Sequence, residues 1–170
     1  MPAYAALLRA VNVGGTGKLA MADLRKLCEA AGFADVATYI QSGNVVFTSK
    51  RGEASVKKLL SAALAEQLGK PCGVLVRTAD ELRELLDANP FPRAAPNRVL
   101  VLFLDEKPAA AKLKDVATPG GEELRVCGRQ VVVHFPNGMG QSKLKLPFRD
   151  LATGRNLNTV RKLLAMLEAM

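Results

Sequence analysis

The spacing of apolar residues switches between two periods along the first half of the chain, in an order that few folds share. Four short apolar runs predict buried strands at residues 3–11, 36–40, 45–49 and 73–77. Apolar residues recur at helical spacing over 21–31 and again over 56–68, and Gly32 and Gly69 are expected to end these two helices. The resulting order, β-α-β-β-α-β, is that of a ferredoxin-like unit.

The second half of the chain follows most of this order. Thr78 and Glu81 form a capping-box pattern for a linking helix, and the proline-rich residues 90–97 are typical of a boundary loop. Beyond this loop, the pattern predicts a strand at 98–104, a helix at 108–117, a hairpin across Gly128 and Arg129, and a closing helix over 160–167. The predicted order is β-α-β-β-α, which is the first pattern without its last strand. No residue-level repeat is obvious.

We therefore predict an α+β fold in which two ferredoxin-like β-α-β-β-α(-β) units, with mainly antiparallel sheets, are fused in one compact body. The first unit and its linking helix are expected over residues 1–89, and the second, related unit over residues 98–170. A chain of 170 residues that is 49% hydrophobic can bury a core of this size.

The charge of the chain favours an anionic partner. The net charge is +8, and residues 125–162 contain eight Lys and Arg residues but one acidic residue, Asp150. Such clustering is typical of proteins that bind phosphate ligands, nucleotides or nucleic acid. A basic face that serves solubility alone is the alternative. Side chains for base stacking are scarce, since there are six Phe, two Tyr and no Trp residues.

Several classes of protein are disfavoured by the composition. Cys28, Cys72 and Cys127 have no C-x-x-C spacing, which argues against a disulfide scaffold and favours the cytoplasm. With His134 as the one histidine, the sequence predicts no metal site and no cofactor. No apolar run approaches the ~20 residues of a spanning helix, so we expect no membrane insertion. The N-terminus has no pattern of a signal peptide.

Two polar, glycine-bearing segments are predicted to lie at the same end of the first sheet. They are residues 12–18 (NVGGTGK), after the first strand, and residues 41–44 (QSGN), between the second and third strands. In a β-α-β-β-α-β unit the third strand pairs with the first, so these loops lie close together. Exposed amides near a helix N-terminus bind anions, and glycines let a ligand approach the backbone. The simpler alternatives are a flexible connector and a hairpin turn in which Gly43 or Asn44 has positive φ.

Known catalytic motifs do not account for these loops. A P-loop requires glycine at position 12 and a hydroxyl at position 19, where the chain has Asn12 and Leu19. Gly15-x-Gly17-x-x-Ala20 fits a loose dinucleotide fingerprint, but Gln41 stands where an acidic ribose ligand is needed. The sequence contains no recognisable pair of a nucleophile and a general base, so the catalytic residues are unknown.

Longer stretches of the sequence resemble a known bacterial family. LLRAVNVGGTGKLAMADLRKLCEAAGF, followed by VATYIQSGNVVF, is similar to the N-terminal signature of the DUF1697 family, a domain of unknown function. SKL at 142–144 and TGRNLNTVRKLL at 153–164 are similar to its C-terminal motif. The resemblance implies a small cytoplasmic protein of two ferredoxin-like halves with no established activity. Leu157 and GMGQ (138–141) depart from the aromatic residues that are frequent in the family at these places.

The resemblance marks polar motif residues as candidates for ligand binding. In the N-terminal motifs these are Arg9, Asn12, Gly14, Gly15, Lys18, Gln41, Ser42, Gly43 and Asn44. In the C-terminal motif they are Ser142, Lys143, Thr153, Arg155, Asn156 and Thr159. Capping of the closing helix by Asn156 or Asn158 explains one or two of these. It leaves Arg155, a cation beside a helix N-terminus, as the best single candidate for contact with an anion.

Two functional hypotheses follow, and the oligomeric state is left open. The first is a protein that binds a phosphate-bearing partner at these loops: a nucleotide, a phosphorylated small molecule or a nucleic acid. The second is a small-molecule enzyme with a site between the two halves, where Arg9, Lys18 and Arg155 act as anion clamps. A structural or interaction module is a third possibility, which a large exposed apolar patch would favour.

Overall fold

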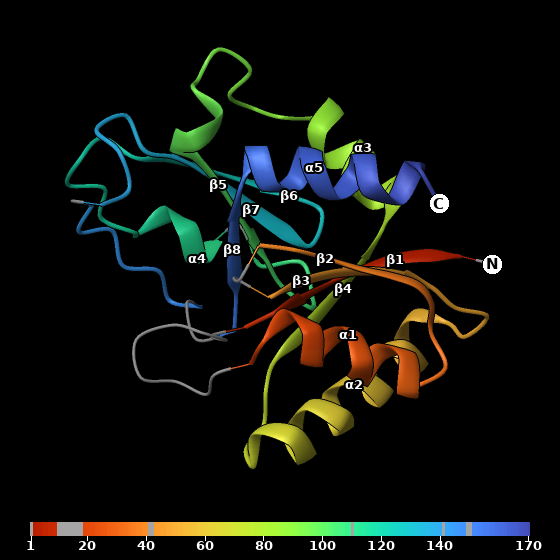
Figure 1. Cartoon of the computed structure of the whole chain (residues 1–170). Helices are drawn as coiled ribbons and strands as arrows, with labels where there is room; N and C mark the ends of the chain where they lie inside the picture. The colour runs from red at the N-terminus through yellow and green to blue at the C-terminus, as the bar shows by residue number, and fades with distance from the viewer. Residues whose placement is uncertain (1, 10–18, 41–42, 110, 141, 149–150) are drawn as a thin grey trace. The chain divides into compact units, whose positions relative to one another are not determined.

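A computed structural model describes residues 2–9, 19–40, 43–109, 111–140, 142–148 and 151–170 (Figure 1). The chain divides into two compact units, residues 1–82 with 163–170 and residues 83–162. Each unit contains a four-stranded antiparallel sheet, with strand orders β2-β3-β1-β4 and β6-β7-β5-β8. The predicted α+β class with two related sheet-and-helix units is confirmed. The domain limits at 89 and 98 stay a prediction.

The first unit has the predicted ferredoxin-like order. Its elements are β1 (Ala3–Leu8), α1 (Met21–Ala30), β2 (Ala34–Tyr39), β3 (Asn44–Thr48), α2 (Glu53–Leu68) and β4 (Val74–Thr78), with α3 (Ala79–Asp87) following. The predicted pairing of the first and third strands is confirmed, since Ala5 lies opposite Val46. Thr78 and Glu81 form the predicted capping box, because each side chain accepts the other residue's backbone N–H at 3.3 Å.

One face of this first sheet is covered by α1 and α2, which lie side by side in Figure 1. Strand residues such as Ala6, Leu8 and Phe47 are buried there together with Leu24 of α1 and Leu60 of α2. The alternation of side chains along each strand brings these residues to the same face. This core holds the end of β1 and the start of β3 in place.

The second unit contains the last strand of the repeat, β8 (Thr153–Asn156), so the prediction that this strand is absent was wrong. Its elements are β5 (Val99–Phe103), α4 (Ala111–Lys114), β6 (Glu123–Cys127), β7 (Gln130–His134) and β8 (Thr153–Asn156), with a short 3₁₀ turn at Pro96–Arg98 before them. Helix α5 (Leu157–Glu168) begins in this unit, and its residues from Leu163 onward are counted with the first unit. The described residues between β7 and β8 form no helix. The closing helix α5 therefore corresponds to α3 and not to α2.

An irregular segment takes the place of the missing helix. Pro136, Gly138, Gly140 and Pro147 interrupt any helical pattern there. The segment still covers the sheet, because Leu144, Leu146 and Phe148 pack against Leu102, Val131 and Val133. These strand residues lie on the face of the second sheet that corresponds to the face covered by α1 and α2 in the first sheet. The sequence KLKL at 143–146 thus places its leucines inward and leaves Lys143 and Lys145 exposed.

The predicted helix at 108–117 was too long. The structure has one helical turn, Ala111–Lys114, and the backbone N–H of Val116 then donates to Leu113 O at 3.4 Å. Alanine and lysine favour a helix locally, but a short exposed helix needs an apolar face to be stable. Here Leu113 and Val116 are half-buried and most of the neighbouring side chains are exposed.

The strand register reveals a repeat that is not obvious in the sequence. Arg77 in β4 lies opposite Ala5 of β1, and Arg155 in β8 lies opposite Val101 of β5. Each arginine stands two residues before a helix, α3 or α5. The stretches that begin at these arginines, RTADELRELL and RNLNTVRKLL, share both arginines and both final leucines at the same spacing. Arg77 and Arg155 therefore occupy equivalent positions in the two units.

Candidate functional site

Most residues of the two predicted N-terminal loops lie outside the described residues. These are Asn12, Gly14, Gly15, Lys18, Gln41 and Ser42. The strand ends beside them are described, and the Leu8 N–H donates to the Gly43 carbonyl at 2.8 Å. The end of β1 and the start of β3 thus meet at one end of the first sheet. Ligand binding by the loop residues themselves stays a prediction.

Gly43 and Asn44 shape the turn before β3. Gly43 has φ +86°, so the expected positive φ is found at this residue. Asn44 is fully buried, and its Nδ2 donates to the Tyr39 carbonyl at 3.0 Å across the turn. Ile40 has φ 51°, an uncommon conformation for a β-branched residue, and is 52% exposed. The described contacts give Asn44 a structural role in the turn.

Arg9 lies at the same end of the sheet, directly after β1. Its N–H donates to the Gly73 carbonyl at 2.9 Å, and its side chain passes over Gly73, where an added Cβ would lie 3.1 Å from the Arg9 Cβ. The Cys72 thiol is 3.8 Å from the Arg9 carbonyl, and burial raises the pKa of this thiol. Arg9 belongs to the first unit and Arg155 to the second, so the anion clamp between the halves stays a prediction.

Arg155 is engaged within its own strand at the edge of the second sheet. In an antiparallel ladder, alternate residues point their backbone groups to opposite sides. The Leu104 N–H donates to the Arg129 carbonyl, so alternate residues of β5 face β7, and Val101 faces β8. The backbone N–H and carbonyl of Arg155 therefore point toward β5, and the Gly154 carbonyl points toward the open edge. Arg155 Nη1 donates to this carbonyl at 2.8 Å and to Thr153 Oγ1 at 2.9 Å.

Two other edge strands carry an arginine in the same arrangement. Arg77 Nη1 donates to the Val76 carbonyl at 2.9 Å, and Arg125 Nη1 donates to the Leu124 carbonyl at 2.8 Å. By the same alternation, both carbonyls point away from their sheets. Arg155 is buried, which lowers its pKa to about 10. These bonds give Arg155 a structural role at a sheet edge, and its contact with a ligand stays a prediction.

Asn156 and Thr159 lie at the start of α5. Asn156 Oδ1 accepts the backbone N–H of Thr159 at 3.0 Å, which confirms Asn156 as the predicted helix cap. Thr153 and Thr159 are both buried. The described contacts of these three residues therefore belong to the strand and to the helix cap that follows it.

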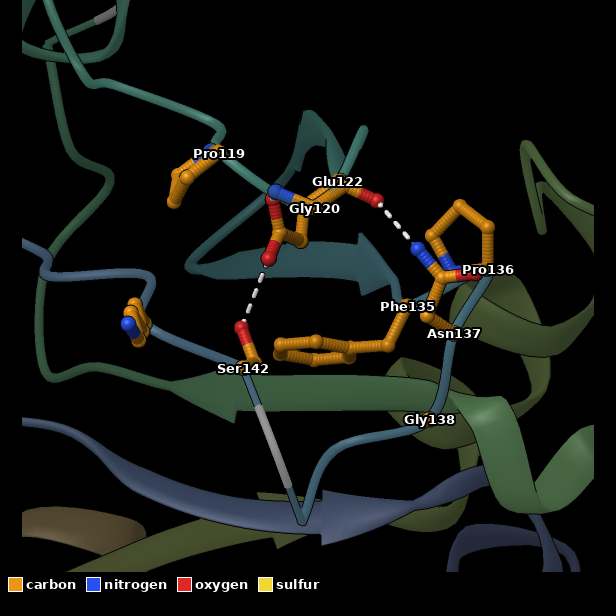
Figure 2. A pocket seen from close by; sticks show the side chains of 9 residues that line it. Pro119, Gly120, Glu122, Phe135, Pro136, Asn137, Gly138 and Ser142 are labelled. Atoms are coloured by element: carbon orange, nitrogen blue, oxygen red, sulfur yellow. Dashed lines mark hydrogen bonds between the residues drawn. The ribbon is translucent and has the colours of Figure 1, made fainter.

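Ser142 and Lys143 line a cavity of about 450 Å³ in the second unit (Figure 2). The other lining residues come from the turn before β6 and from the segment after β7: Pro119, Gly120, Glu122 and residues 135–138. In Figure 2 the Ser142 and Glu122 side chains point toward each other, and the Phe135 ring lies beside Ser142. The cavity thus lies along the segment that replaces a helix of the first unit.

Hydrogen bonds tie the walls of this cavity together. Ser142 Oγ donates to Glu122 Oε1 at 2.7 Å and accepts the Leu144 N–H at 3.2 Å. The Gly120 N–H donates to Glu122 Oε2 at 2.9 Å. Asn137 Nδ2 donates to the Gly120 carbonyl at 3.0 Å (Figure 2). Glu122, which is 6% exposed, therefore has both carboxylate oxygens fixed in position.

Glu122 is a residue that the sequence analysis missed. It belongs to the sequence GGEE at 120–123, which leads into β6, and nothing in that sequence distinguishes it from its exposed neighbour Glu123. The glycine at position 120 is a weak sequence signal of this contact. A side chain there would leave no room for the carboxylate, because an added Cβ would lie 2.7 Å from Glu122 Oε1. The contact with Ser142, 20 residues further along the chain, is decided by the tertiary fold.

The charge of Glu122 is stabilised chiefly by the Ser142 hydroxyl, which lowers the pKa of this carboxyl. Ser142→Ala is therefore expected to raise the pKa of Glu122, as measured by NMR titration of its side-chain carboxyl carbon. A carboxyl with a lowered pKa stabilises the fold above its unfolded pKa, and this contribution is lost as the pH falls through the folded value. The variant should accordingly lose part of the pH dependence of stability in acid.

Ser61→Ala is the matched control, because Ser61 lies on α2 in the first unit. Its effect on the pKa of Glu122 should be nil. An unchanged pKa of Glu122 in Ser142→Ala would contradict the role given to the hydroxyl.

The described residues contain no group of three His, Cys, Asp or Glu side chains that could hold a metal ion. No helix in this part of the chain is long and apolar enough to cross a membrane. A second cavity, of about 480 Å³, is lined by residues that include Leu104, Phe148 and Leu151. Among the predicted binding residues that the structure describes, none lines this second cavity, so the cavity at Ser142 and Lys143 is the better candidate site.

Comparisons with known proteins agree with the fold. A family model described as a protein of unknown function, DUF1697, matches residues 1–132. The solved structure of the conserved bacterial protein SP0830 from Streptococcus pneumoniae is similar over 98% of both chains, with a TM-score of 0.80 and 27% sequence identity. No curated protein matches the sequence.

Proposed function

This chain belongs to the DUF1697 family, and we propose that it binds a small phosphate-bearing ligand in the cavity around Ser142 and Lys143. The observation that carries the proposal is the position of Lys143. Its side chain is exposed at the cavity and forms no hydrogen bond or ion pair with the described residues. An ammonium group in this setting is available to a phosphate.

The composition of the sequence range that contains Ser142 and Lys143 supports an anionic ligand. Residues 125–162 carry eight basic residues and one acidic residue, a net charge of +7. Such an excess raises the local concentration of anions and speeds their association. Loops on a rigid sheet are also a common place for binding residues.

A small ligand suits the cavity better than a nucleic acid does. A volume of about 450 Å³ is in the range of small-molecule pockets. Binding of single-stranded nucleic acid usually requires exposed aromatic rings for base stacking. Phe135, the aromatic residue of the cavity, is 7% exposed and has little surface for this purpose. The cytoplasm is the compartment that we propose, supported by the free thiols of Cys28, Cys72 and Cys127.

Lys143→Ala is expected to weaken binding of phosphate-bearing ligands about tenfold, because a charge-assisted contact is lost. Isothermal titration calorimetry with inorganic phosphate, ribose 5-phosphate, adenosine monophosphate and a short oligonucleotide measures this change. Affinity should fall as the ionic strength rises. Lys145→Ala is the control, since Lys145 is exposed on the same alternating segment and does not line the cavity.

The proposal fails if none of these compounds binds at low ionic strength, or if the two lysine variants behave alike. Tight binding of the oligonucleotide alone would replace the small ligand with a nucleic acid.

A further inference from the structure

Resting on this proposed function, we infer that the cavity selects phosphate esters whose carbon skeleton carries several hydroxyl groups, that is, sugar or polyol phosphates. The reason is the presence of a fixed carboxylate in the same cavity as Lys143. Glu122 would repel a bare phosphate and weaken its binding. A ligand compensates for this repulsion only if it also brings hydrogen-bond donors.

The Glu122 carboxylate has acceptor capacity left for such donors. A carboxylate offers about four lone-pair sites. The Ser142 hydroxyl and the Gly120 N–H use one site on each oxygen, and the backbone N–H of Glu122 itself is a third donor to the carboxylate, which leaves about one site for a ligand. These bonds also fix the direction of the group, so the remaining site is already oriented when a ligand arrives. The Ser142 hydroxyl is the main cause that lowers the pKa of this carboxyl, which favours its ionised, accepting form.

The other walls of the cavity fit a carbon skeleton with hydroxyl groups. Asn137 uses Nδ2 for its bond to the Gly120 carbonyl, which leaves Oδ1 as another acceptor. Pro119 and Pro136 provide apolar surface for the C–H groups of a ring or chain. The cavity thus combines an ammonium group, oriented acceptors and apolar walls, and a sugar phosphate matches all three.

The cavity lies where the second unit departs from the repeat. In the first unit the equivalent face of the sheet is covered by two helices, α1 and α2. In the second unit the irregular segment covers this face, and its Ser142, Lys143 and Asn137 line the cavity. The departure from the repeat thus brings these three residues to the cavity.

The test compares ribose 5-phosphate with propyl phosphate, which carries the same anion but no hydroxyl groups. Titration calorimetry with the wild-type chain should show at least about tenfold tighter binding of ribose 5-phosphate, as expected for hydroxyls that donate to a charged acceptor. Glu122→Gln should remove most of this preference. Its affinity for propyl phosphate should stay the same or increase, because the repulsion is removed.

Glu123→Gln is the matched control: it makes the same charge change at the next residue, which is exposed and does not line the cavity. This variant should keep the wild-type preference. Equal affinities of the wild type for the two esters would overturn the inference while leaving the proposed function intact. Failure of both esters to bind would instead remove the proposed function. The wild-type comparison decides the question even if Glu122→Gln does not fold.

Discussion

Gly43→Ala is expected to lower the free energy of unfolding by about 3 kcal/mol, the largest effect among the variants considered. Two costs add at this position. Gly43 has φ +86°, a conformation that an alanine side chain disfavours. An added Cβ would also lie 2.9 Å from the Leu8 Cβ, in the core of the first sheet. Equilibrium unfolding in urea measures the change.

Two further glycines separate these costs. Gly32 has φ +91° with no atom within 4 Å of an added Cβ, so Gly32→Ala should cost about 1 kcal/mol through the backbone alone. Gly140 also has open space and no positive φ, and Gly140→Ala should change stability by less than about 0.5 kcal/mol. Equal losses in Gly43→Ala and Gly32→Ala would show that the close approach to Leu8 has no energetic consequence.

Arg155→Lys and Arg77→Lys are each expected to destabilise the fold by about 2 kcal/mol. The substitution keeps the positive charge but removes the planar guanidinium, which donates to the outward carbonyl of the preceding residue. Both side chains are buried, at 7% and 1% exposure, so water does not replace the lost bonds. An ammonium group is also more strongly hydrated than a guanidinium, which makes its burial more costly.

Arg125→Lys is the internal control for this pair. Arg125 makes the same bond to the Leu124 carbonyl, but its side chain is 56% exposed. Its replacement should change the free energy of unfolding by less than about 0.5 kcal/mol. Urea unfolding of the three variants would contradict the edge-strand role if all of them lost the same stability, or if the buried pair lost none.

The first unit could be predicted from its sequence because local and tertiary signals agree. The helix end at Gly69, with φ +70°, and the capping box at Thr78 and Glu81 depend on residues close together in sequence. Strand pairing followed from the order of the elements. Gly43 was recognised as a turn residue from its neighbours, although its close approach to Leu8 was not.

The second unit was harder to predict because its sequence lacks local signals where the fold departs from the repeat. Residues 153–156 form β8, but the presence of Asn156 suggested a helix cap and hid the short strand. Asn156 has both roles, since it ends the strand and caps α5. The equivalence of Arg77 and Arg155 became visible only through strand register.

The candidate site was predicted in part. Ser142 and Lys143 were singled out in sequence, and they line the cavity. Glu122, Gly120 and Asn137 were not, because their contacts join segments that are 17 and 20 residues apart. Arg155 was selected for its charge near a helix N-terminus, and burial at a sheet edge could not be read from that charge.

The sequence alone determined the class of fold, the helix caps and the basic character of the second half, because these properties depend on apolar period, on neighbouring residues and on composition. The tertiary structure alone decided which polar groups meet in the cavity and which arginines are buried. Such contacts depend on how strands align and on what covers each sheet, and residues distant in the chain carry no local mark of them.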